Sequence, residues 1–343
     1  MRVVTAHAAM DLRVEDRPDP GDPGPGRVRV RMAAGGICGS DLHYYRHGGF
    51  GAVRLREPMI LGHEVSGHVE AVGAGVEGLA PGDLVAVSPS RPCGACRYCL
   101  EGLPNHCEAM RFYGSAMPFP HVQGAFREVL MADAAQCVPA GGLSAAEAAM
   151  AEPLAVCLHA TRQAGEMLGR TVLVTGCGPI GILSILAARR AGADRIVATD
   201  LSAFCLDMAR RAGADEVVDV SDDPDGLARY AAGKGTFDVL YECSGAEPAL
   251  RAALAAMRPR GVVVQLGLGG DMTLPMQMLT AKELSLRGSF RFHAEFATGV
   301  SLMRKGLIDV APFVTGTRPV AEAVDAFEAA GDRARHVKVQ LAF

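Results

Sequence analysis

The chain has 343 residues, of which 49% are hydrophobic and 21% charged, and its formal net charge is −4. This length predicts two domains, because a single hydrophobic core seldom extends over so many residues. Charges of both signs are interspersed, which argues against the basic surface of a nucleic-acid-binding protein. No signal segment is recognisable, and glycines and a proline interrupt the longest apolar stretch, residues 172–188, so we expect no membrane span and a cytoplasmic protein.

The first 150 residues are typical of a β-rich domain. Residues 28–32 alternate between apolar and polar side chains, as a half-buried strand does. Two further strands are expected at residues 69–72 and 84–87, with glycine and proline turns between them.

From residue 152 the pattern changes to short apolar strands that alternate with helices. We expect strands at residues 171–175, 195–199, 216–218, 238–241, 262–265 and 283–287, and helices at 180–191, 202–212, 225–232 and 248–257. This alternation predicts an α/β domain with a doubly wound parallel sheet of six strands. Two more helices, at residues 294–305 and 320–330, precede a last strand at 336–341 that we expect to rejoin the first domain. The predicted boundaries are 1–151 with 290–343, and 152–289.

A glycine-rich turn follows the first strand of this series and opens a helix. It reads Gly176-Cys177-Gly178-Pro179-Ile180-Gly181. In that context the turn predicts a dinucleotide whose pyrophosphate lies at the helix N-terminus. Asp200 ends the next strand, where a carboxylate binds ribose hydroxyls and repels a 2′-phosphate, and no arginine follows directly, so NAD is favoured over NADP. The alternative is that Asp200 only caps the next helix.

Four of the ten cysteines form a cluster in one loop: Cys93, Cys96, Cys99 and Cys107. Four thiolates close a tetrahedron around a structural zinc ion. A four-iron cluster is the competing interpretation, but the spacing of seven residues before Cys107 and the absence of a following proline disfavour it. The other cysteines are scattered among apolar neighbours and indicate core residues in a reducing compartment.

A second metal site is predicted around the run Gly62-His63-Glu64. Imidazole and carboxylate suit a zinc ion that keeps one position open. Cys38, on a glycine-flanked turn, and Glu152 complete a set of thiolate, imidazole and carboxylate ligands. Each residue also has a simpler interpretation, since His63 and Cys38 could be core residues and Glu152 a charge at a helix N-terminus.

These motifs together resemble the zinc-containing medium-chain alcohol dehydrogenases over essentially the whole chain. The run from Gly62 to Val76 matches their signature at every fixed position. Residues 36–45 and 151–156 are similar to the polyol branch, which contains sorbitol dehydrogenase. Residues 110–122, 286–292 and 338–343 resemble the bacterial L-idonate 5-dehydrogenase subfamily. That subfamily interconverts L-idonate and 5-dehydro-D-gluconate with a nicotinamide cofactor.

The resemblance implies a GroES-like catalytic domain, a Rossmann domain and roles for particular residues. Cys38, His63, Glu64 and Glu152 would surround a catalytic zinc, with direct binding by either glutamate left open. Ser40 and His43 match a relay that carries the alcohol proton outward. The implied substrate contacts are Phe126, Arg291 and Phe292, and the implied cofactor contacts beyond the glycine turn are Leu266 and Phe290. Arg291 is the first candidate to meet the carboxylate of idonate, with Arg111 and His121 as alternatives.

Three other functions remain open at this point. A neutral-polyol dehydrogenase for sorbitol, xylitol or galactitol would carry the same residues, and a threonine dehydrogenase is a more distant rival. A non-catalytic nucleotide-binding protein is the rival of a different class, although such relatives typically lose the zinc ligands that this chain keeps. The resemblance also implies a homo-oligomer, a dimer or tetramer, that pairs the edges of its cofactor-domain sheets.

Overall fold

The computed structural model describes residues 1–343 and divides into two compact units. One unit comprises Met1–Glu152, Phe296–Asp332 and Lys338–Phe343, and the other comprises Pro153–Glu295 and Arg333–Val337. The first unit is therefore assembled from both ends of the chain. The division differs from the expected boundaries at Glu152, which lies in the first unit, and at residues 290–295 and 333–337, which lie in the second unit. No helix is both long enough and apolar enough to cross a bilayer.

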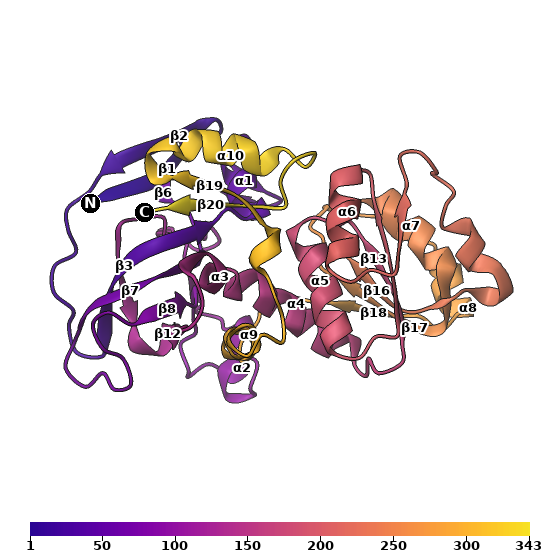
Figure 1. The fold of residues 1–343 in the computed structure, drawn as a ribbon, viewed down its shortest axis with the longest axis horizontal. Helices are drawn as coiled ribbons and strands as arrows, with labels where there is room; N and C mark the ends of the chain where they lie inside the picture. Colours follow the sequence, from indigo (N-terminus) through magenta and orange to yellow (C-terminus); the bar gives the residue numbers. More distant parts are fainter. The chain divides into compact units, whose positions relative to one another are not determined.

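The first unit contains a seven-stranded sheet (Figure 1). Its strand order is β12-β8-β7-β3-β20-β19, and β11 also pairs with β3. The bounds are β3 (Arg27–Gly36), β7 (Glu64–Val72), β8 (Leu84–Val87), β11 (Val129–Asp133), β12 (Cys137–Pro139), β19 (Val314–Pro319) and β20 (Lys338–Ala342). The strands expected at residues 28–32, 69–72 and 84–87 all fall within this sheet. A smaller sheet has the order β2-β1-β6, with bounds β1 (Arg2–Ala8), β2 (Asp11–Asp16) and β6 (Met59–Ile60).

The C-terminal strand β20 rejoins this first unit, as expected. It runs antiparallel to β3, with Gln340 opposite Gly36 and Ala342 opposite Ala34. On its other side β3 pairs with β7, and Gly36 lies opposite Glu64. The last residues of the chain are thereby brought beside the Gly-His-Glu run, although nearly the whole sequence separates them.

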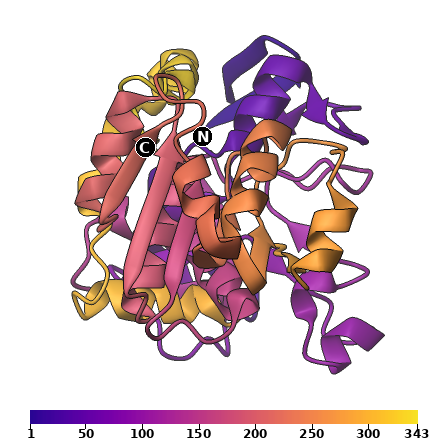
Figure 2. The same cartoon turned by 90° about the vertical axis from the view of Figure 1, so that its right-hand side faces the viewer.

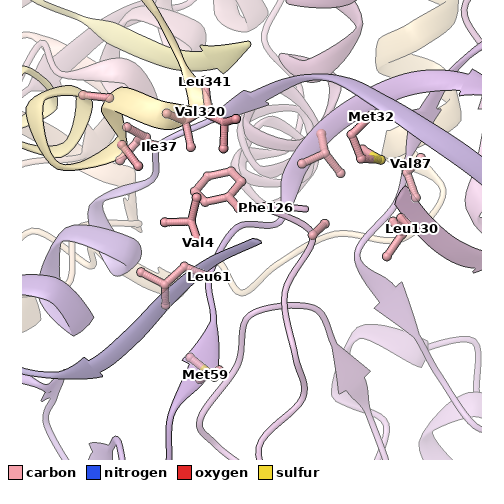
Figure 3. Close-up of a cluster of buried hydrophobic side chains, with 14 of the residues drawn as sticks. Val4, Met32, Ile37, Met59, Leu61, Val87, Phe126, Leu130, Val320 and Leu341 are labelled. Atoms are coloured by element: carbon pink, nitrogen blue, oxygen red, sulfur yellow. The ribbon is translucent and has the colours of Figure 1, made fainter. Parts of the chain in front are cut away.

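The core of the first unit is built around Phe126 (Figure 3). This ring is fully buried and contacts Phe327 and Phe343. Gly62 has a positive φ of 92°, and a Cβ there would overlap the ring of Phe126. The glycine before His63 is thus required by both its backbone conformation and the close approach of the ring.

The second unit contains a six-stranded sheet of order β15-β14-β13-β16-β17-β18. Its strands are β13 (Thr171–Thr175), β14 (Arg195–Asp200), β15 (Glu216–Asp219), β16 (Phe237–Glu242), β17 (Met257–Gln265) and β18 (Ser285–Gly288). All pairings are parallel, which confirms the predicted doubly wound sheet. Helices α5 (Pro179–Arg190) and α6 (Ala203–Arg211) cover one face, and α7 (Glu247–Ala256) and α8 (Met276–Ala281) cover the other (Figures 1 and 2).

One predicted helix of this unit is wrong. Residues 225–232 were expected to be α-helical, but the chain forms the 3₁₀ segment Ala228–Lys234. Ala232 and Gly233 have non-helical dihedral angles, and Gly233 and Gly235 have positive φ. The glycines end each helical turn before an α-helix can extend. The later helices follow expectation as α9 (Glu295–Arg304) and α10 (Ala323–Gly331).

The remaining helices connect strands. The first unit also contains α1 (Gly39–His47), α2 (Arg97–Leu100) and α3 (Ala145–Ala149), and α4 (Ala151–Ala164) begins at its end. The short strands are β4 (Gly49–Phe50), β5 (Val53–Arg54), β9 (Ser90–Arg91) and β10 (Arg111–Phe112). Helix α1 was not predicted from periodicity, because its nine residues are mostly polar or glycine-flanked and carry no clear apolar stripe.

The buried carboxylate of Glu295, near the end of the second unit, is expected to contribute to stability in a pH-dependent way. Glu295 accepts hydrogen bonds from Arg162 Nη1 at 2.7 Å and from the His293 N–H at 2.9 Å, and lies 3.3 Å from His159 Nδ1. Burial alone would raise its pKa, but the bonds from His159 and His293 outweigh burial and lower the pKa of Glu295 to about 2. Its contribution to stability is therefore present above the ordinary glutamate pKa and is lost as the pH falls toward 2.

We expect Glu295→Gln to lower the free energy of unfolding by about 1–3 kcal/mol at pH 7. The difference from the wild type should shrink at pH 4, because the unfolded wild type then takes up a proton. Urea unfolding at both pH values measures this. Glu283→Gln, at an exposed position of the same unit, is the control. An equal loss at both pH values would show that the carboxylate charge is not the cause.

Candidate active site

The four clustered cysteines form one group in the first unit. Their sulfur atoms all lie within 4.8 Å of one another. Cys99 Sγ is 3.6 Å from Cys96 Sγ and 4.0 Å from Cys93 Sγ. A tetrahedron of thiolates around zinc, with zinc–sulfur bonds of about 2.3 Å, requires sulfur atoms about 3.8 Å apart. The donor set and its spacing therefore fit a zinc ion with no open position.

Backbone N–H groups of the same loop support the thiolate form. The Cys96 N–H donates to Cys93 Sγ at 3.3 Å, and the Cys93 N–H donates to Cys107 Sγ at 3.2 Å. Backbone hydrogen bonds from Cys99 and Glu108 lower the pKa of Cys96 to about 6. Thiolates rather than thiols bind metal, so these bonds favour the metal-binding form of Cys96, whereas burial raises the pKa of Cys99 to about 12. None of the ten cysteines is in a disulfide.

A second group of ligand atoms is formed by Cys38, His63 and Glu64, which lie within 4.8 Å of one another. Cys38 precedes helix α1, and the other two lie at the start of β7. His63 and Glu64 are buried. His63 Nδ1 has no hydrogen-bond partner, although it is buried. Burial alone would lower the pKa of His63, but the negative charges of Asp41 and Cys38 raise it well above its ordinary value. The same charges would stabilise a divalent cation, so the residues present fit zinc.

Asp41 lies behind His63 and has no exposed surface. Its carboxylate accepts the Cys38 N–H at 3.1 Å and the Gly62 N–H at 3.2 Å, and Asp41 Oδ1 is 3.7 Å from His63 Nδ1. Burial is the main reason that the pKa of Asp41 is raised. Asp41 therefore fixes the backbone on both sides of the site and places a negative charge beside the imidazole.

Glu64 has a second partner in Lys338, which was not expected. Lys338 Nζ donates to both carboxylate oxygens, at 2.6 and 2.8 Å, and to the Ile37 carbonyl at 3.1 Å. Both side chains are about 1% exposed. The ammonium group compensates the charge of Glu64, so Lys338 competes with any metal for the same two oxygens.

Glu152 is also buried, at the beginning of α4, but it does not belong to the group of three ligand atoms. Burial, with Glu64 and Asp41 adding to it, raises the pKa of Glu152 to about 7, although His63 and Lys338 oppose this. Its charge is therefore close enough to act on the site. The Glu152 carboxylate is not among the ligand atoms that lie within 4.8 Å of one another.

Ser40 and His43 lie on the same side of helix α1, three residues apart, and both are partly exposed. Burial, with a smaller contribution from His47, lowers the pKa of His43 below its ordinary value. A neutral imidazole at the end of a path to solvent can accept a proton. The helix thus carries the metal-ligand candidate Cys38 at its start and the two relay candidates within its first turns.

Phe126 is a correction. The resemblance implied a substrate contact, but the ring is fully buried in the core between Phe327 and Phe343 and has no surface to offer. The aromatic ring beside the site is instead that of Phe112, whose centroid lies 5.6 Å from that of His63. Phe112 is on β10, and the exposed Arg111 precedes it on the opposite face of the strand.

His121 is also a structural residue. Its Nε2 accepts the Arg56 N–H at 2.9 Å, and its Nδ1 lies 2.9 Å from the Pro118 carbonyl, to which it donates. Both ring nitrogens are therefore used by the backbone in the neutral form. The side chain is buried, so it does not meet a substrate carboxylate.

The glycine turn of the second unit has the form expected of a dinucleotide site. Gly178 precedes α5, and Pro179 occupies its first position. A Cβ at Gly181 would overlap the Gly176 carbonyl, and one at Gly176, where φ is 82°, would meet the Ser244 backbone at 2.8 Å. At Gly178, by contrast, a Cβ would have no neighbour within 4 Å. This open face at the helix N-terminus fits the approach of a pyrophosphate.

Asp200 ends β14 next to this turn. Its Oδ2 accepts the Cys177 N–H at 2.6 Å, and its Oδ1 accepts the Ser202 N–H at 2.8 Å. The carboxylate is thus held between the glycine turn and the start of α6. Each oxygen keeps acceptor capacity, which suits the hydroxyl groups of a ribose.

The other candidates of the second unit follow its strands at the same edge of the sheet. Leu266 comes directly after β17, and Phe290 comes after β18 with 43% of its surface exposed. The Arg291 guanidinium lies 4.9 Å from the centre of the Phe290 ring, and Arg291 has a positive φ of 55°. Phe292 is buried. Ligands of open parallel sheets bind outside the carboxyl ends of the strands, where Gly176 and Leu266 lie.

Comparison with known families accounts for both units. Residues 24–142 match the alcohol dehydrogenase GroES-like domain, and residues 179–305 match the zinc-binding dehydrogenase family.

The chain belongs to the zinc-binding alcohol dehydrogenases.

The relatives of this dehydrogenase differ in their substrates. L-Idonate 5-dehydrogenase (NAD(P)(+)) of Escherichia coli K12 is 45% identical over 316 residues, which are 92% of this chain and 91% of that protein. Human sorbitol dehydrogenase is 38% identical over 330 residues, 95% of this chain and 91% of that protein. The crystal structure of L-idonate 5-dehydrogenase from E. coli K-12 MG1655 has a TM-score of 0.94 and 42% identity, and covers 100% of this chain and 98% of that one. The chain is thus an oxidoreductase of the polyol dehydrogenase type.

Three residues of this dehydrogenase were missed in the sequence. Asp41 lies within the glycine-flanked turn, and its spacing from Cys38 could have indicated a cap of helix α1. Phe112 lies in no recognisable motif, so nothing in the sequence indicated that it would lie beside the site. Lys338 lies in an alternating strand pattern, where a lysine is normally exposed, so only the pairing of β20 with β3 reveals it.

Proposed function

We propose that this dehydrogenase oxidises a secondary alcohol of a sugar acid, L-idonate, to 5-dehydro-D-gluconate with NAD. The observation that carries the catalytic part is the group of the half-buried Cys38 and the buried His63 and Glu64, whose ligand atoms lie within 4.8 Å of one another. The similarity to the E. coli L-idonate 5-dehydrogenase supports the substrate. A cytoplasmic location and a homo-oligomer, a dimer or tetramer, are part of the proposal.

The metal part of the proposal is two zinc ions per chain. Cys93, Cys96, Cys99 and Cys107 would hold the structural ion. Cys38 and His63 would hold the catalytic ion, with Glu64 as a third ligand. Glu152 would bind it directly or through water. Zinc supplies a Lewis acid that polarises the alcohol oxygen, and the nicotinamide supplies the hydride acceptor.

The chain's own residues would orient the substrate and move its proton. The Asp41 carboxylate lies 3.7 Å from His63 Nδ1, and the Phe112 ring lies beside the imidazole. Ser40 would take the alcohol proton, and His43 would release it to solvent, for which its lowered pKa is suited. The glycine turn with Pro179 and Ile180, together with Leu266 and Phe290, would bind the dinucleotide. Asp200 would bind the adenosine ribose and favour NAD over NADP.

Arg291 would bind the carboxylate that idonate has and neutral polyols lack. Its planar guanidinium matches a carboxylate with two parallel hydrogen bonds. We expect Arg291→Ala to raise KM for L-idonate by about ten-fold or more, while KM for sorbitol changes less than about three-fold. Steady-state formation of NADH measures both values.

Arg111→Ala is the matched control for this prediction, because Arg111 is exposed in the first unit. Equal losses on idonate and sorbitol in Arg291→Ala would contradict the carboxylate role. A selective loss in Arg111→Ala would transfer that role to Arg111.

A substrate panel separates the proposed function from its rivals. L-Idonate, D-gluconate, sorbitol and xylitol are each tested with NAD and NADP, and L-threonine is added. The highest kcat/KM for L-idonate is expected. A preference for sorbitol or xylitol would instead indicate a neutral-polyol dehydrogenase like the human relative, and turnover of threonine would indicate an amino-acid dehydrogenase. No turnover, with dinucleotide binding intact, would indicate a non-catalytic protein.

A further inference from the structure

A hollow of about 580 Å³ opens beside Asp200 in the second unit. Residues 200–204, which connect β14 to the first turn of α6, line one side of it. Arg333 and Ala334 also line it, although they are far away in the sequence. The hollow is therefore bordered by an anionic and a cationic side chain at the end of the second strand of the parallel sheet. In a Rossmann sheet this position lies next to the 2′-position of the adenosine ribose.

The segment that carries Arg333 is fixed to the same helix. Ser202 Oγ donates to the Arg333 carbonyl at 2.9 Å, and Cys205 Sγ donates to it at 3.4 Å. Arg333 Nη1 donates to the Val337 carbonyl at 3.0 Å. This bond limits the orientation of the guanidinium. The arginine is therefore held at the hollow by the backbone of its own segment and by the first turn of α6.

We propose that Arg333 is a second determinant of cofactor specificity, which binds the 2′-phosphate of NADP and lets the enzyme use NADP as well as NAD. The inference rests on the proposed binding of a dinucleotide and extends it. Asp200 is held by two backbone N–H groups and repels a phosphate. A guanidinium that lines the same hollow offsets that repulsion and offers charge-assisted hydrogen bonds to phosphate oxygens. NAD has an uncharged 2′-hydroxyl in place of the phosphate, so Arg333 contributes little to NAD binding.

Binding of NADPH and NADH to the purified protein tests this without any alcohol substrate. Isothermal titration calorimetry gives both dissociation constants, and 2′,5′-ADP and 5′-AMP serve as fragments. We expect Arg333→Ala to weaken NADPH and 2′,5′-ADP binding by about ten-fold or more, and NADH and 5′-AMP binding by less than about two-fold. Arg333→Lys should keep part of the NADPH affinity. Arg335→Ala, two residues along and outside the lining of the hollow, is the control.

A second variant tests the opposition of the two charges. Asp200→Asn should strengthen NADPH binding, and adding Arg333→Ala to it should remove that gain. Equal losses for NADH and NADPH in Arg333→Ala, no loss in either, or a wild type that binds NADH and not NADPH would each overturn the role of Arg333 and leave the proposed oxidation intact. A wild type that binds neither cofactor would overturn the dinucleotide site itself.

Discussion

His63→Ala is expected to lower kcat/KM for alcohol oxidation by about a thousand-fold or more, because a Lewis acid contributes several kcal/mol to stabilising the developing charge. His63 is one of three ligand candidates and is buried, and the negative charges of Asp41 and Cys38 act on its imidazole. Without it, a thiolate and a carboxylate that already pairs with Lys338 would remain to bind the ion. Zinc content should therefore fall from the two proposed ions per chain to one.

The same experiment separates the two metal sites. Zinc is measured by atomic emission in the purified protein, and the fold is checked by circular dichroism. His68→Ala is the control, because His68 lies on the same strand β7 and is exposed. It should keep two zinc ions and full activity. If His63→Ala also kept two ions, or kept its activity, the catalytic metal would have to lie elsewhere.

Lys338→Met is expected to lower the free energy of unfolding of the zinc-depleted protein by about 3–5 kcal/mol. The substitution leaves the Glu64 carboxylate buried, with about 1% of its side chain exposed, and removes the ammonium group that donates to both of its oxygens. A buried charge without a partner is costly, because the protein interior solvates it poorly. Urea unfolding monitored by circular dichroism measures the loss.

Zinc and a second substitution identify the cause of this loss. If Glu64 binds the catalytic ion, zinc replaces the missing positive charge, and the loss should be smaller in the zinc-loaded protein. Adding Glu64→Gln removes the buried charge and should restore part of the stability of Lys338→Met, so that the two changes are not additive. Additive losses would show that Lys338 acts through packing alone. An unchanged loss after zinc loading would show that the ion does not use Glu64.

Much of the fold could be predicted, because its signals are local. The six parallel strands follow from short apolar runs that alternate with helices, and their order β15-β14-β13-β16-β17-β18 is the doubly wound arrangement that such runs predict. The α-helix predicted at residues 225–232 is wrong, because the glycines at 233 and 235 end the short 3₁₀ segment that forms there. The return of the last strand to the first unit was expected from its place after the parallel series, and its pairing with β3 confirms it.

The candidate site likewise has parts that local sequence predicts and parts that it does not. The sequence by itself determined the cysteine loop, the glycine turn and the His63–Glu64 pair, because each depends on residues that are close together in the chain and on backbone geometry that glycine and proline impose. Only the tertiary structure decided which side chains surround them. It placed Phe126 in the core, Asp41 behind His63, Lys338 against Glu64 and Arg333 beside Asp200. Those contacts depend on strand pairing and packing between distant segments, which local sequence patterns do not encode.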